Sequence, residues 1–91
     1  MGHGIVKVVD INIIFRQSAF KHGVTETDIR RVFKIPEYDA VFEEGDPTKN
    51  LLICFDCNAN PLEILYNVID ENTVQVFHAM KCRAVLLSLL K

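Results

Sequence analysis

The sequence predicts an α+β domain with a four- to five-stranded, mostly antiparallel sheet, two N-terminal helices and a short C-terminal helix. Three observations favour this class. An alternating β-branched segment comes first, a helix with an apolar face follows, and the second half contains strand-like runs separated by polar turns. The expected order is β-α-α-β-β-β-β-α. Because the chain has 91 residues, we expect residues 1–91 to form one domain.

The N-terminal half predicts one strand and two helices. A strand is expected in Val6–Phe15, where every second residue is apolar and faces a core. A short helix is expected in Arg16–His22, and Gly23 ends it as a C-cap glycine. A second helix is expected in Glu26–Lys34, because Thr25 offers an N-cap side chain and apolar residues recur at helical spacing.

The second half predicts a meander of four strands, which share apolar or alternating patterns. They are Tyr38–Glu43, Leu51–Asp56, Leu62–Ile69 and Thr73–Met80. The segment "EEGDPTK" reads as a polar turn. The hairpin before the last strand is predicted to have a three-residue loop, "DEN", with Asn72 in a left-handed conformation. The final "CRAVLLSLLK" predicts a short helix whose apolar residues must be covered by the sheet or by another chain.

Composition restricts the function classes. The net charge is −2 and the pI about 5.8, so the chain lacks the basic excess of a dedicated nucleic-acid binder. No apolar run reaches the roughly 18 residues that span a membrane, and the N-terminus does not resemble a signal peptide. The three cysteines fit a reducing compartment. We therefore expect a cytoplasmic protein.

Two groups of residues invite a chemical role and also have an ordinary structural explanation. Cys54 and Cys57 form a C-x-x-C, but residues three apart in a strand point to opposite faces. We therefore predict no metal, no cofactor and cysteines that serve as small apolar side chains. Glu63 shares a strand face with Asn67 and is a candidate general base if that face is open. An exposed carboxylate on a sheet face is the more common explanation.

The segment "VFHAMKCR" is the strongest candidate site. Alternation places His78 on the same strand face as Val74, Val76 and Met80, which predicts a partly buried ring. Two cationic residues, Lys81 and Arg83, follow at the end of the strand. Cations beside a histidine can bind a phosphate while the imidazole moves a proton. A core histidine, with the cations paired to nearby carboxylates, is the structural alternative.

Other basic residues are weaker candidates. Arg30 and Arg31 on the second helix are expected either to join the anion site or to form a solvated helix face. His22 lies just before Gly23, where an imidazole also complements the dipole of a helix C-terminus.

Two segments resemble a known family. "AFKHGVTETDIRRVF" resembles the "KHGVS-x-x-(D/E)-A-x-x-VF" opening of the BrnT family of bacterial type II toxins. "TVQVFHAMKCR" falls where that family has its last strand, and the resemblance extends in order over Ala19–Arg83. The chain is closer to a looser group of small toxin-like proteins with "KHG" near the start and "HAM-x-x-R" near the end. It departs from BrnT in its acidic charge and in "HAM", which replaces "SAR".

The resemblance implies a RelE-like fold, a metal-independent endoribonuclease activity on RNA and a cognate antitoxin that covers the site. The residues that it implies as catalytic are His78, Arg83 and His22. The substrate-binding residues expected beside them are Lys81, Arg30, Arg31 and Lys21.

A non-catalytic protein-binding or regulatory domain on the same fold is the alternative, and a homodimer stays open. The ribonuclease requires His78 and Arg83 to reach one concave surface. The binding domain predicts a sealed His78 whose ring nitrogens are bonded to the backbone.

Overall fold

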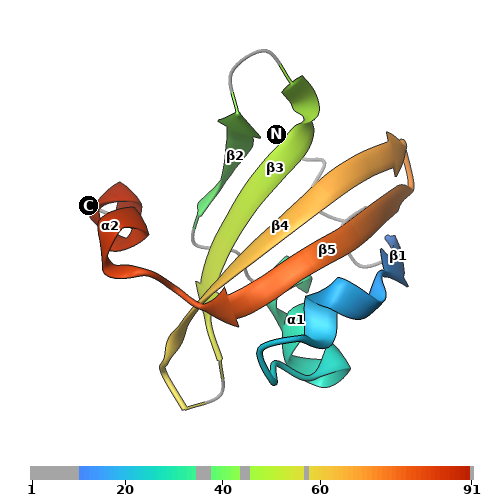
Figure 1. Cartoon of the computed structure of the whole chain (residues 1–91). Coiled ribbons are helices and arrows are strands. Elements are labelled where there is room, and N and C mark those ends of the chain that lie inside the picture. Colours follow the sequence, from blue (N-terminus) through green and yellow to red (C-terminus); the bar gives the residue numbers. More distant parts are fainter. Residues whose placement is uncertain (1–10, 35–37, 44–45, 57, 91) are drawn as a thin grey trace.

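The protein is described here by a computed structural model, which covers residues 11–34, 38–43, 46–56 and 58–90. The predicted α+β class is confirmed, with one five-stranded sheet and a short C-terminal helix (Figure 1). The first half of the strand predicted in Val6–Phe15 lies outside the described residues, as does Cys57 of the C-x-x-C.

The strands form a mixed sheet in the order β1-β5-β4-β3-β2. Their bounds are β1 Asn12–Phe15, β2 Tyr38–Glu43, β3 Asp46–Phe55, β4 Pro61–Asp70 and β5 Thr73–Lys81. The pairings from β2 to β5 are antiparallel, as the meander predicts, whereas β1 pairs with β5 in parallel. The first and last strands of the chain therefore lie side by side (Figure 1).

One α-helix, not two, precedes the meander. The helical elements are the 3₁₀ turn η2 Gln17–Phe20, α1 Glu26–Lys34, α2 Ala84–Leu87 and the 3₁₀ turn η3 Ser88–Leu90. The first predicted helix is only η2, because so few residues cannot support a nucleated α-helix before Gly23 ends the segment at φ 83°. The N-cap of α1 is confirmed, since the Thr25 hydroxyl accepts the Asp28 N–H at 3.2 Å.

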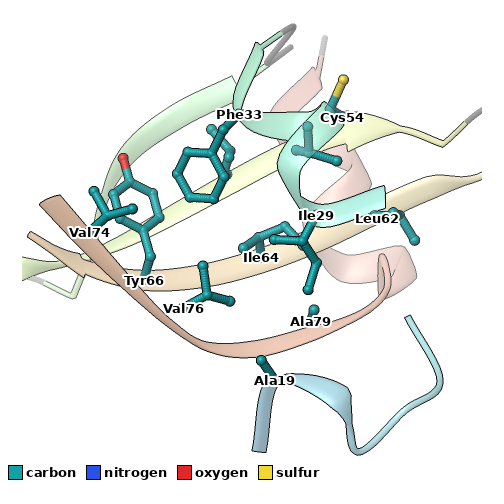
Figure 2. Close-up of a cluster of buried hydrophobic side chains, with 12 residues drawn as sticks. Ala19, Ile29, Phe33, Cys54, Leu62, Ile64, Tyr66, Val74, Val76 and Ala79 are labelled. Carbon is teal, nitrogen blue, oxygen red and sulfur yellow. The ribbon is translucent and has the colours of Figure 1, made fainter. Parts of the chain in front are cut away.

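The main core lies between α1 and one face of the sheet (Figure 2). Ile29, Val32 and Phe33 of α1 are buried against strand residues such as Ile64 and Val76. Their i, i+3, i+4 spacing places the three side chains on one face of α1, so the sequence pattern alone predicts which face of the helix is buried.

The minor core lies on the opposite face. It consists of Leu51, Ile53 and Leu65, with half-buried side chains packed around them: Tyr38, Phe77, Cys82, Leu86 and Leu90. Leu51 belongs to the minor core and its neighbour Leu52 to the main core, so β3 is covered on both faces. This double coverage explains the continuous apolar run in that strand.

Two turn predictions need correction. The segment predicted as the turn "EEGDPTK" is partly strand, because β3 already begins at Asp46, which pairs with Glu43 across a register shift. At the β4–β5 hairpin, Asp70 pairs with Thr73 and its carboxylate accepts the Asn72 N–H at 2.8 Å. Asn72 therefore needs no left-handed backbone. Among the non-glycine residues that the structure describes, Ala59 has that conformation, at φ 64°.

Candidate functional site

Glu63 is the centre of the candidate site. It lies in the apolar run of β4 directly opposite Ile53 of β3, so its side chain points to the face that carries the minor core. Its side chain has no exposed area, which contradicts the expectation of an exposed sheet-face carboxylate. A charge on a strand covered on both faces is stable only if it is paired and hydrogen-bonded.

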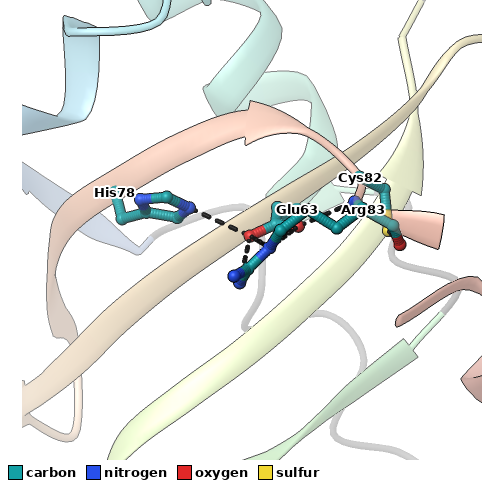
Figure 3. Close-up of polar contacts among 4 residues, drawn as sticks. All are labelled: Glu63, His78, Cys82 and Arg83. Atoms are coloured by element: carbon teal, nitrogen blue, oxygen red, sulfur yellow. Dashed lines mark hydrogen bonds and ion pairs between the residues drawn. The ribbon is translucent and has the colours of Figure 1, made fainter. Parts of the chain in front are cut away.

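Arg83 supplies most of that pairing (Figure 3). Its Nε donates to both oxygens of Glu63, at 3.0 Å to Oε1 and 3.1 Å to Oε2, and its Nη2 donates to Oε2 at 2.8 Å. Its backbone N–H also donates to Oε1, at 2.9 Å. The planar guanidinium fork suits this two-oxygen contact, which a lysine could not reproduce.

These contacts determine the charge state of the pair. Burial on its own would raise the pKa of Glu63, but the hydrogen bonds from Arg83 and His78 outweigh it and hold the pKa below its usual range. The same carboxylate raises the pKa of Arg83. Glu63 is therefore ionised and can only accept hydrogen bonds.

His78 is the third member of the cluster. Its Nε2 lies 3.0 Å from Glu63 Oε2, and its side chain is 23% exposed. Because an ionised carboxylate only accepts, Nε2 carries the proton, and in the neutral ring Nδ1 is then the nitrogen that can accept one. The non-catalytic alternative predicts a sealed ring whose nitrogens bond to the backbone. The ring of His78 is instead partly exposed, and its Nε2 bonds to a carboxylate.

His22 lies next to His78. The two rings meet edge to face, with centroids 5.6 Å apart and planes at 70°. His22 follows η2, which packs against β5, and its side chain is exposed. Two imidazoles from distant parts of the sequence, one of them oriented by a buried carboxylate, are thus brought together at the surface.

A β-bulge corrects the predicted strand faces. Leu65 pairs with His78 but Tyr66 pairs with Val76, so Phe77 is an extra residue in β5. Simple alternation placed His78 on the face of Val76, in the main core. The bulge reverses the alternation, and His78 faces the minor-core side with Glu63 instead.

The remaining predicted basic residues are not brought to this cluster. Arg30 and Arg31 belong to α1, which covers the main core on the other face of the sheet. Lys81 pairs with Leu62, a main-core residue, and its charge acts on Asp56 in the β3–β4 turn. Lys21 is exposed beyond η2. The site contains His78, Arg83 and His22 but not these four.

The arginines of α1 have other surroundings. Arg30 Nε donates to Glu26 at 2.8 Å, and its guanidinium lies over the Phe15 ring at 5.2 Å from the centroid. Together with Thr27 and Lys34 they line a surface hollow on this helix. The prediction of a solvated helix face fits these contacts better than a shared anion site with His78.

The residues that the structure describes contain no group of three or more His, Cys, Asp and Glu side chains able to hold a metal. Cys54 is buried in the main core, and Cys82 is half-buried at the edge of the minor core. Burial, followed by the charge of Glu63, raises the pKa of Cys82, which disfavours the reactive thiolate.

Sequence reasoning named Glu63 but not its partners. The available signal was a carboxylate in the middle of a strand that is apolar on both faces, because such a charge requires a cation nearby.

Searches against protein-family models, curated proteins and solved structures find no match to the chain. Across the described ranges, no helix has the length and apolar character needed to cross a membrane.

Proposed function

We propose that the protein is a metal-independent endoribonuclease that cleaves RNA, acting in the cytoplasm as the toxin of a bacterial toxin–antitoxin pair. One observation carries the proposal: His78, oriented by buried Glu63, lies against a second histidine, His22. Paired imidazoles of this kind supply an acid and a base without a metal ion.

The reaction follows from the roles of the two rings. In the proposed step His78 Nδ1 takes the proton of a ribose 2′-hydroxyl, and the 2′-oxygen attacks the adjacent phosphorus. The bond from phosphorus to the 5′-oxygen breaks, and protonated His22 gives its proton to that oxygen. The products are a 2′,3′-cyclic phosphate and a free 5′-hydroxyl. Glu63 stabilises the positive charge that His78 acquires.

In this proposal Arg83 has the second of the two roles expected of it, that of a cation paired with a carboxylate, and not the role of a catalytic phosphate ligand. Its fork is directed onto Glu63, so its charge is largely neutralised by a carboxylate in direct contact. It acts as a positioning residue that fixes Glu63, which in turn fixes His78, rather than as the main phosphate ligand.

Cleavage of a single-stranded RNA in the presence of a chelator tests the proposal. We expect cleavage with a cyclic phosphate product, loss of about 10²–10⁴-fold in rate for His78→Ala and for His22→Ala, and a bell-shaped pH dependence. A 2′-deoxyribose at the cleaved position should block the reaction. Arg31→Ala, on the other face of the sheet, is the matched control and should keep full activity. Equal rates for wild type and His78→Ala would reject the proposal.

The C-terminal helix supports the second candidate function, a protein-binding domain. Neither α2 nor η3 contains a buried residue, and Val85 is 75% and Leu89 40% exposed. An apolar surface of this kind suits a partner protein, which in the first proposal is the antitoxin. A homodimer would cover the same residues.

Induced expression in a bacterial host separates the two functions. Growth arrest by the wild type but not by His78→Ala, at matched soluble levels, supports the toxin. Absence of arrest, together with a dimer in sedimentation analysis that Val85→Asp dissociates, supports the binding domain instead.

A further inference from the structure

The bulge in β5 places two neighbouring side chains on the same sheet face. Phe77 packs on the minor core, to which Leu65 belongs, and His78 reaches Glu63 on that face. In a regular strand these consecutive residues would point in opposite directions. The bulged carbonyl is held from outside the strand, because the Ser18 hydroxyl donates to the Phe77 carbonyl oxygen at 2.6 Å. Bulges of this kind commonly redirect a side chain beside a functional site.

Phe77 also lines a shallow surface cavity of about 340 Å³. The other lining residues come from the segment after β1 and from two strands: Arg16, Ser18, Lys49 and Asn67. Its size lies near the lower end of the range for small-ligand sites, about 300–1,000 Å³. The cavity is therefore suited to one small unit of a polymer rather than to a folded partner.

The lining matches the chemistry of a nucleotide. An aromatic ring can stack on any base, an amide such as that of Asn67 can hydrogen-bond a base edge, and the guanidinium of Arg16 is a cation for the phosphate. Although the net charge of the chain is −2, a guanidinium is among the described residues that line this cavity. Arg16 therefore offers an anionic ligand a local cation.

We propose that this cavity binds one nucleotide of a single-stranded RNA, with its base on Phe77 and its phosphate near Arg16. This inference rests on the proposed ribonuclease function and identifies where its substrate is held. Phe77 and His78 are consecutive, with Cα atoms about 3.8 Å apart, so the residue that holds the base is next in sequence to the proposed base of the reaction. His78 itself does not line the cavity, which therefore binds a nucleotide next to the one that is cleaved. The phosphate-binding cation that the "VFHAMKCR" segment was expected to supply is then Arg16, in the segment after β1.

Binding of a fluorescent, uncleavable 2′-O-methyl oligonucleotide, measured by anisotropy, tests the inference without requiring cleavage. Phe77→Leu keeps apolar packing on the minor core but removes the ring, and we expect the Kd to rise about 5- to 100-fold. Arg16→Gln should weaken binding and reduce the slope of log Kd against log salt by about one. Arg31→Gln removes the same charge from the opposite face of the sheet and should leave the Kd unchanged.

The outcomes distinguish this inference from the proposed function. Binding that depends on Phe77 and Arg16, in a protein that never cleaves RNA, supports the nucleotide site and rejects the ribonuclease. Cleavage by a protein whose Phe77→Leu and Arg16→Gln variants bind like the wild type rejects the site and keeps the ribonuclease. Loss of affinity in Arg31→Gln alone would place the RNA on α1 and overturn the inference, as would absence of any oligonucleotide binding.

Discussion

Arg83 binds the buried carboxylate of Glu63 through both its side chain and its own backbone N–H, and it does so from the N-cap position of α2. The contact therefore joins the middle of the sheet to the start of the C-terminal helix. It also fixes the oxygen that bonds to His78. One ion pair thus serves both the fold and the candidate site.

Replacing Arg83 should destabilise the domain. Arg83→Ala leaves a buried carboxylate without its main partner, and we expect the free energy of unfolding to fall by about 2–3 kcal/mol, with water replacing part of the contact because Arg83 is half exposed. Arg83→Lys should recover only part of the loss. Urea denaturation measures both, with Arg31→Ala as an exposed control expected within about 0.5 kcal/mol of wild type. Of the two roles expected for Arg83, phosphate binding or pairing with a nearby carboxylate, the ion pair with Glu63 corresponds to the second.

Glu63 should make stability depend on pH. Its pKa in the folded protein is lowered from the ordinary 4.5, so its stabilising effect is complete above that pH and is lost as the pH falls through the folded value. Glu63→Gln should be less stable near neutral pH, and the gap to wild type should narrow in acid. The pKa of Asp56 is also lowered, but Asp56 is present in both wild type and Glu63→Gln. Its effect on the free energy of unfolding therefore cancels when the two proteins are compared. Parallel stability curves for the two proteins would contradict the assignment.

Thr25 should stabilise α1 as its N-cap. The Thr25 hydroxyl accepts the Asp28 N–H, and Thr25→Ala removes this acceptor at a cost of about 1 kcal/mol. Thr25→Ser retains the hydroxyl and is expected to remain close to wild type. Thermal unfolding of the two variants side by side gives the comparison, and an equal loss in both would point to the methyl group instead.

Tyr66 should contribute through its hydroxyl. The ring is buried, and its hydroxyl donates to Asp39 at 2.6 Å, so Tyr66→Phe is expected to cost about 1–2 kcal/mol. Burial and then this hydrogen bond raise the pKa of Tyr66 above 10.0, so its contribution is present below that pH and is lost as the pH rises further. Tyr38→Phe is the matched control. Denaturation at neutral and alkaline pH should show the difference between the variants shrinking in alkali.

Local patterns predicted most of the elements. The apolar face of α1 and its Thr25 cap are properties of short segments, and the structure confirms both. Gly23 has the expected left-handed backbone, but η2 already ends at Phe20 and its C-cap is Lys21. The apolar run at Leu51–Asp56 likewise predicted a strand, and β3 is covered on both faces. The β1–β5 pairing was not predicted, because it joins segments from the two ends of the described chain.

The arrangement of the site depended on one feature that no pattern revealed. Alternation along "TVQVFHAM" is regular in sequence, yet the extra residue Phe77 reverses the faces after it. Without the bulge, alternation assigns His78 to the main-core face of Val74 and Val76, away from Glu63. Register depends on long-range pairing, so the residues of one strand alone do not determine it.

The parallel pairing of β1 with β5 also has a consequence for synthesis. A chain leaves the ribosome from its N-terminus, and β1 has no strand partner until β5, near the other end, has emerged. The hairpins from β2 to β5 form from neighbouring segments, whereas β1 must wait with its edge unpaired. Contacts that close so long a loop slow folding, and the apolar residues of β1 remain available to chaperones until β5 has been synthesised.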